Sequence, residues 1–208
     1  MLQRMISLQA TDVHIKYVLD IGSYHGQFGD TVRAVWPEAQ VISIEAEEQH
    51  RSINPSQITA CLGKEDNQWV EFHTLPPGSI TTGASYYKEL TGFYQNSVTV
   101  PLRTMTLDSL YRANSWSADW ANHGLVKLDT QGSELDILSG AQSFIKEQKP
   151  RFFLLEVSHQ QYNLNAPLAS QTVKYMNDMG YNWIDIWEIT HDSRNMLLQS
   201  DLLFERKP

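Results

Sequence analysis

The chain has 208 residues, of which 41% are hydrophobic and 19% are charged, a composition typical of a globular protein and not of a disordered or collagen-like chain. Its 16 Lys and Arg against 24 Asp and Glu give a formal net charge of −8 without any Lys/Arg cluster, so a nucleic acid is not expected as a partner. No stretch approaches the roughly 18 uninterrupted apolar residues of a membrane span, and the single cysteine, Cys61, cannot form an internal disulfide, so we expect a cytoplasmic protein.

Residues 1–15 carry apolar side chains at helical spacing, so we expect a short lead-in helix ahead of a single domain that spans residues 16–208. In that domain, apolar runs typical of strands alternate with amphipathic stretches typical of helices. The predicted strands are residues 16–21, 40–45, 57–62, 69–73, 125–129, 151–157, 181–187 and 197–205, and the predicted helices are residues 31–36, 134–144 and 168–179.

This alternation predicts an α/β fold in which a parallel sheet is covered by helices on both faces. The last two predicted strands are joined by the short polar segment 188–196, which leaves no room for a crossover helix. We therefore expect these two strands to pair as an antiparallel hairpin at the end of the sheet.

The least regular stretch, residues 74–97, contains three glycines and four aromatic residues. A loop of this length in a compact domain is typical of a functional segment, and glycines can serve as its hinges. We expect a lid on the substrate side of the site. A static surface loop held down by its aromatic rings is the alternative.

The first predicted strand runs into a glycine turn, in the sequence VLDIGSYHGQFG at residues 18–29. Ligands of α/β sheets bind at the carboxyl ends of strands, where glycines let the backbone approach them closely. Gly22 and Gly26 are separated by three residues, which does not match the G-x-G-x-x-G spacing of a pyrophosphate site. The carboxylate of Asp20 would repel a phosphate and suits a ligand with an ammonium group, although a purely structural turn is the alternative.

Glu45 ends the second predicted strand, 23 residues beyond Gly22. Nucleoside sites of doubly wound sheets place an acid at this point to hold the ribose hydroxyls. The alternative is that Glu45 only begins an acidic, solvated turn, because Glu47 and Glu48 follow it. Asp20, the glycine turn and Glu45 together indicate a site for a cationic nucleoside.

Five motifs then occur in a fixed order along the chain. They are DIGSYHGQF at residues 20–28, IE at 44–45, LDSL at 107–110, KLDTQGSE at 127–134 with LSGA at 138–141, and LEVS at 155–158; DLLF at 201–204 fits as a last strand. This series resembles the FkbM-type family of S-adenosylmethionine-dependent methyltransferases over about residues 16–206. The resemblance implies a Rossmann-like sheet of seven strands in the order 3-2-1-4-5-7-6. It also implies O-methylation of a hydroxyl on a sugar, a glycan or a small natural product, with S-adenosylhomocysteine as the product.

The resemblance also implies which residues bind the cofactor. They are Asp20, Gly22, Ser23, Tyr24, Gly26, Gln27, Phe28, Glu45, Ala46, Cys61, Leu62 and Asp129. The amino-acid end of the cofactor would lie along the glycine turn, the ribose at Glu45, and the adenine against Cys61 and Leu62. Tyr24 and Ala46 depart from the family, which more often has Asn and Pro at these positions.

Three residues are the candidates for catalysis: Asp129, Glu156 and His159. Asp129 and Glu156 lie at the ends of neighbouring predicted strands, so their side chains can face one acceptor pocket. We expect Asp129 to border both cofactor and acceptor, and Glu156 or His159 to take or relay the proton of the acceptor hydroxyl. Lys127 is expected to form an ion pair that anchors its strand.

Two other functions remain open at this point. A nicotinamide-dependent oxidoreductase would also use this fold, although the glycine spacing and Asp20 oppose it. A non-catalytic domain that has kept only the cofactor pocket is the second alternative. A divalent metal such as magnesium would suit the two carboxylates, but two ligands are too few to predict a metal site, and no oligomeric state is indicated.

Overall fold

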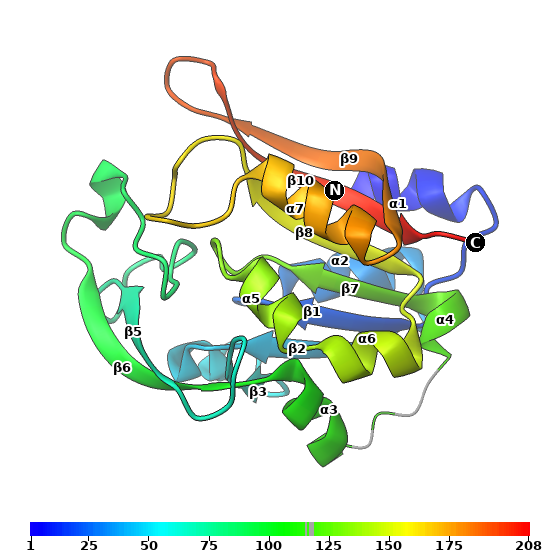
Figure 1. Cartoon of the computed structure of the whole chain (residues 1–208), viewed down its shortest axis with the longest axis horizontal. Coiled ribbons are helices and arrows are strands. Elements are labelled where there is room, and N and C mark those ends of the chain that lie inside the picture. The colour runs from blue at the N-terminus through cyan, green and yellow to red at the C-terminus, as the bar shows by residue number, and fades with distance from the viewer. Residues whose placement is uncertain (115, 117–118) are drawn as a thin grey trace.

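The centre of the molecule is a seven-stranded sheet in the order β3-β2-β1-β7-β8-β10-β9, seen in a computed structural model that describes residues 1–114, 116 and 119–208 (Figure 1). The strands are β1 Tyr17–Ile21, β2 Gln40–Glu45, β3 Ile58–Thr59, β7 Gly124–Leu128, β8 Phe152–Ser158, β9 Tyr181–His191 and β10 Leu197–Arg206. The first five of these pair in parallel, and β10 pairs antiparallel with both β8 and β9. The predicted α/β fold with a mostly parallel seven-stranded sheet is therefore confirmed.

The strand numbers differ from those expected because three further strands lie between β3 and β7 in the chain. They are β4 Cys61–Leu62, β5 Trp69–Thr74 and β6 Val98–Met105, which form a separate sheet in the order β4-β6-β5. The single strand expected at residues 57–62 is consequently two short ones, because the chain leaves the main sheet after Thr59 and pairs with β6 instead. β6 was not predicted, because most of its side chains are exposed and its sequence lacks the apolar run of a buried strand.

The pairing of β9 with β10 also differs in detail from the expected hairpin. Three register shifts interrupt it, and β9 continues to His191 instead of ending at residue 187. β9 lies at the edge of the sheet, where polar side chains face solvent and do not end a strand. The polarity of residues 188–191 was therefore no sign of a loop.

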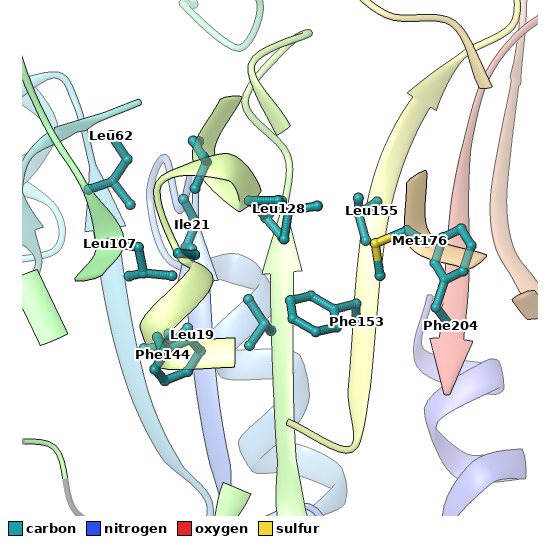
Figure 2. Packing of buried hydrophobic residues seen from close by; sticks show 14 of the residues in the cluster. Leu19, Ile21, Leu62, Leu107, Leu128, Phe144, Phe153, Leu155, Met176 and Phe204 are labelled. Atoms are coloured by element: carbon teal, nitrogen blue, oxygen red, sulfur yellow. The ribbon is translucent and has the colours of Figure 1, made fainter. Parts of the chain in front are cut away.

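Helices cover both faces of the main sheet. They are α1 Leu2–Gln9, α2 Gln27–Val35, α3 Leu107–Asn114, α4 Trp120–His123, α5 Glu134–Ser139, α6 Gln142–Gln148 and α7 Ala169–Asp178, with 3-10 helices at Glu48–Ser52 and Gly92–Tyr94. Side chains of α1 and α2 pack in one buried cluster, and those of α3 to α7 pack in the other. Figure 2 shows part of the second cluster, where Leu19, Leu128 and Phe153 of three neighbouring strands meet the helices. None of the described helices has the length and apolarity of a membrane span.

Strand alternation decides which residues reach the site. Along β1, Leu19 and Ile21 point into the cluster beneath α3 to α7, while Val18 packs with α1 and α2. Asp20 therefore points to the face of α2, and Lys127, its partner in register on β7, points the same way.

Two helices differ from the sequence prediction. α2 begins at Gln27, directly after Gly26 with its left-handed φ of 85°, and not at residue 31. The helix expected at residues 134–144 is broken into α5 and α6 at Gly140, where a side chain would collide with the backbone oxygen of Gly63 at 2.3 Å. Both changes bring a helix start or a tight contact close to the ends of the strands.

Candidate functional site

Two cavities adjoin at the carboxyl ends of β1, β2 and β7. The first has a volume of about 110 Å³ and the second about 340 Å³. Gly22, Tyr24, Thr82 and Asp129 line both of them. The two cavities therefore form one continuous groove, with Asp129 at its middle.

The backbone at the middle of the groove is tightly packed. The N–H groups of Gly22 and Ser23 both donate to the carbonyl of Ile44, at 2.9 and 3.1 Å, and the N–H of Asp129 donates to the carbonyl of Ile21 at 3.1 Å. These bonds tie together the ends of β1, β2 and β7. Gly22 has a φ of 76°, and a Cβ atom there would lie 1.9 Å from the carbonyl oxygen of Asp129. Only glycine fits this turn without displacing the chain at Asp129.

Glu45 occupies one wall of the first cavity. Its carboxylate accepts hydrogen bonds from the N–H of Tyr24 at 2.8 Å and from the N–H of Glu47 at 3.1 Å. The side chain is buried and not solvated, and this burial raises the pKa of Glu45. Glu45 thus presents a fixed hydrogen-bond acceptor at the end of β2.

Part of the lining of the first cavity is apolar. Ala46, Cys61 and Leu62 line it together with Ile44. Burial raises the pKa of the Cys61 thiol to about 12, so the thiol stays neutral at physiological pH. An acid beside an apolar wall is an arrangement that suits a ribose next to a flat aromatic base.

The loop between β5 and β6 covers the first cavity through Thr81, Thr82, Ala84 and Tyr86. A buried network anchors this loop to the end of β2. The carboxylate of Glu47 accepts from the hydroxyl of Thr74 at 2.6 Å, and the Nε2 of His50 lies 3.0 Å from Glu47 and 2.9 Å from Thr81. These contacts fix part of the loop beside the first cavity.

The second cavity is acidic. Asp129, Glu156, Glu188 and Asp201 line it, and Lys127 is the only Lys or Arg among the lining residues of the described chain. The ammonium group of Lys127 lies 3.0 Å from Asp129 and 3.6 Å from Asp20. Lys127 is therefore already paired with the two aspartates, and the N-terminal ammonium of Met1, which also lines the cavity, pairs with Glu188 at 2.6 Å.

Glu156 faces Asp201 directly across the antiparallel pair of β8 and β10. Burial, together with repulsion by Asp129 and Asp201, raises the pKa of Glu156 well above its usual range. Burial and the charge of Asp129 likewise raise the pKa of Asp201 to about 7. Like charges opposite each other on neighbouring strands are destabilising, and acids with shifted pKa values are typical of functional sites.

The structure brings most of the predicted site residues to this groove. Gly22, Tyr24, Glu45, Ala46, Cys61, Leu62 and Asp129 line the first cavity, and Gly22, Ser23, Tyr24, Gln27, Phe28, Asp129 and Glu156 line the second. Asp20, Gly26 and His159 line neither one. Asp20 is fully buried beside Lys127, and the Nε2 of His159 lies 2.7 Å from the hydroxyl of Ser200, which itself lines the second cavity.

Sequence analysis did not single out Thr82, Gln131 or Asp201, which also line the groove. Gln131 lies inside the KLDTQGSE motif and Asp201 begins the DLLF motif, so the motifs carried a signal for both. The sheet register that places Asp201 opposite Glu156 was not readable from the sequence. Within residues 1–114, 116 and 119–208, no group of three or more His, Cys, Asp or Glu side chains is arranged to hold a metal ion.

Comparisons with known proteins concern the family and the fold. The family described as the methyltransferase FkbM domain matches residues 20–182 of the chain. No curated protein sequence matches it. Among solved structures, the methyltransferase FkbM from Methylobacillus flagellatus KT is similar with a TM-score of 0.52 and 15% identity, over 91% of this chain and 43% of that one.

A second similar structure is the 1,6-didemethyltoxoflavin-N1-methyltransferase of Burkholderia thailandensis, which contains bound 1,6-didemethyltoxoflavin and S-adenosylhomocysteine. Its TM-score is 0.51 and its identity 8%, over 100% of this chain and 78% of that one. At these identities both likenesses show a shared fold. This chain spans less than half the length of the Methylobacillus protein.

Proposed function

The chain belongs to the FkbM methyltransferase family, and on this premise we propose that it transfers the methyl group of S-adenosylmethionine to a hydroxyl oxygen of a sugar, a glycan or a small natural product. The observation that carries the proposal is the meeting of two different cavities at Asp129. One has the features of a nucleoside site, and the other is acidic and open to an acceptor. Methyl transfer is an in-line displacement, so placing the two reactants in contact supplies much of the catalysis.

The residues of the first cavity fit the cofactor. Glu45 would accept hydrogen bonds from the ribose hydroxyls, and the wall of Cys61 and Leu62 would contact the adenine. The hydroxyl of Ser23 is buried without a hydrogen-bond partner among the described residues and lines the adjoining cavity, which gives the amino-acid end of the cofactor a polar contact. When bound, the cofactor supplies an electrophilic methyl group on a sulfonium.

Asp20 acts in this proposal through Lys127 and not by touching the cofactor. Its carboxylate is fully buried, and its nearest charged group is the ammonium of Lys127. This ion pair holds Lys127 in place, and Lys127 in turn holds the carboxylate of Asp129 at 3.0 Å. Asp129 then borders both reactants.

On the acceptor side, Glu156 takes the proton of the acceptor hydroxyl. Its side chain lines the second cavity, within which a hydroxyl can reach it. His159 would serve as a relay, because its ring contacts the hydroxyl of Ser200, which lines the same cavity.

Binding of the cofactor is the first test. Calorimetric titration of the full chain should show micromolar binding of S-adenosylhomocysteine and no comparable binding of NAD, because the spacing of Gly22 and Gly26 does not match a pyrophosphate site and the acids around Asp129 would repel one. Tight binding of NAD would reverse this order and favour an oxidoreductase. Binding of S-adenosylhomocysteine without any methyl transfer would favour a non-catalytic binding domain.

A matched pair of variants sharpens this titration. Glu45→Ala should weaken S-adenosylhomocysteine by about 1–3 kcal/mol, because ribose hydroxyls and two backbone N–H groups lose a charged acceptor. Glu48→Ala removes the same charge three residues away, from a side chain that is 65% exposed, and should leave the affinity unchanged. Equal affinities for the parent and Glu45→Ala would exclude the ribose contact.

The loop of residues 74–97 is proposed as a lid that closes over the acceptor. Thr82 lines both cavities, so closure of this loop would cover the point of methyl transfer and exclude water from it. Limited proteolysis should cut the loop in the free protein and spare it when S-adenosylhomocysteine and an acceptor are bound. Equal cleavage of this segment in both conditions would reject the lid and leave a static loop.

A further inference from the structure

Gln131 joins the two acids at the middle of the groove. Its Nε2 donates a hydrogen bond of 2.6 Å to the Oε2 of Glu156 and one of 3.2 Å to the Oδ1 of Asp129. The side chain is 9% exposed, and its Oε1 lies 3.5 Å from the Nε2 of Gln199. One amide group therefore uses both of its N–H donors on two carboxylates that belong to different strands.

The backbone of Gln131 is held in an unfavourable conformation to place this amide. Its φ is 56°, in the left-handed region that glycine and asparagine adopt more easily than glutamine. Glu134 stabilises this turn, because its carboxylate accepts hydrogen bonds from the N–H of Thr130 at 2.8 Å and from the N–H of Gly132 at 3.1 Å. Glycine or asparagine would adopt this backbone conformation more easily. We therefore attribute the presence of glutamine at this position to the contacts that its side-chain amide makes.

The charges around Glu156 explain what the amide contributes. Burial is the largest cause that raises the pKa of Glu156, and the charges of Asp129, Asp201 and Glu134 raise it further. Lys127 is the charged group that acts to lower it, and Tyr162 is also near, with its own pKa raised by burial. Lys127 is engaged by Asp20 and Asp129. Gln131 gives the carboxylate of Glu156 its only hydrogen bond among residues that the structure describes. A hydrogen bond donated to the charged form stabilises that form.

We propose that Gln131 is a positioning residue that favours the ionised form of Glu156 and aims its carboxylate into the second cavity. Its neutral amide donates hydrogen bonds to the carboxylates of Glu156 and Asp129 and so stabilises their negative charge. Because the amide carries no positive charge, it does not neutralise Glu156, which keeps its capacity to accept a proton. A lysine at this position would neutralise Glu156 and weaken it as a base. The role of this proton acceptor in methyl transfer rests on the proposed function; the effect on ionisation does not.

The test measures ionisation directly and needs no acceptor. The side-chain carboxyl of Glu156 is titrated by carbon-13 NMR in the full chain labelled at glutamate, with its resonance assigned by its absence in Glu156→Gln. Gln131→Gly suits the left-handed backbone and removes the amide, so it should raise the titration midpoint of Glu156 by about one pH unit or more. Gln131→Asn also suits this backbone and keeps a shorter amide, and its midpoint should lie between those of the parent and Gln131→Gly.

The control is Gln199→Ala, which removes the neighbour of the Gln131 oxygen but leaves both N–H donors in place. Its midpoint should stay within a few tenths of a pH unit of the parent. A midpoint in Gln131→Gly equal to that of the parent would overturn the proposal, as would equal shifts in Gln131→Gly and Gln199→Ala. Affinity for S-adenosylhomocysteine is measured on the same samples. A raised midpoint in Gln131→Gly supports the role of Gln131 whether or not the protein binds S-adenosylhomocysteine. Absence of S-adenosylhomocysteine binding would count against the proposed function and not against the role of Gln131.

Discussion

Replacing Glu156 by Gln is expected to lower the rate of methyl transfer about a hundredfold or more, because the acceptor hydroxyl loses its general base. The amide of Gln has the shape of the acid but cannot accept a proton at neutral pH. The affinity for S-adenosylhomocysteine should remain nearly intact, since Glu156 is no part of the first cavity, which would hold the nucleoside. The measurement is transfer of a tritiated methyl group from S-adenosylmethionine to hydroxylated sugars and small molecules, using the acceptor that the parent protein labels.

The control for this loss of rate is Glu188→Gln. Glu188 also lines the second cavity, but its side chain is 52% exposed and forms a surface ion pair with the N-terminal ammonium of Met1 at 2.6 Å, so its loss should cost little. His159→Ala should lower the rate too if His159 relays the proton through Ser200. Parent rates in both Glu156→Gln and His159→Ala would mean that positioning of the reactants alone drives the reaction.

As the pH rises, the rate of methyl transfer should increase while the stability contributed by Glu156 decreases. Glu156 must be ionised to act as a base, so the rate should rise as the pH rises through its raised pKa. The raised pKa means that the folded protein holds this proton more tightly than the unfolded chain, so the stability contributed by Glu156 is present below pH 4.5 and is lost as the pH rises through the folded value. Glu156→Gln should therefore be no less stable than the parent at pH 8, which separates loss of chemistry from loss of fold.

Most of the strands, and the residues that end them, could be predicted because they follow from local patterns, whereas an order of the strands was expected only from the resemblance to a family. The glycine turn after β1 and the acid that ends β2 are read directly from the sequence, and parallel strands bring such residues to one edge of the sheet. The motif that contains Asp129 likewise marks the end of a buried strand. These residues could be assigned to one edge of the sheet without knowing which side chains face each other across neighbouring strands.

The contacts across the sheet could not be predicted in this way. Whether Asp201 faces Glu156 depends on the register between β8 and β10, which the sequence of neither strand determines. Asp20 was expected to border the cofactor, but its strand turns it toward Lys127 and into the core. Gln131 acquires its position from a left-handed turn whose backbone conformation no propensity would assign to glutamine.

Gly22→Ala is expected to have the largest effect of any single methyl group added to this protein. The left-handed φ of 76° costs alanine about 1–2 kcal/mol. The added Cβ would also lie 1.9 Å from the carbonyl oxygen of Asp129, and relief of such a collision costs typically about 1–3 kcal/mol more. Together these terms should lower the free energy of unfolding by about 2–5 kcal/mol, as measured by urea denaturation.

Gly180→Ala separates the two contributions. Gly180 has a φ of 88°, and a Cβ atom there would meet nothing within 4 Å. It should therefore lose only the conformational part, about 1–2 kcal/mol, and keep the parent affinity for S-adenosylhomocysteine. Gly22→Ala must in addition move the chain at Asp129, which borders both cavities, so its affinity should fall at least about tenfold, since even about 1.4 kcal/mol of displaced contacts is a factor of ten. If the two variants were equally stable and bound S-adenosylhomocysteine equally well, the close approach of Gly22 to Asp129 would have no part in forming the site.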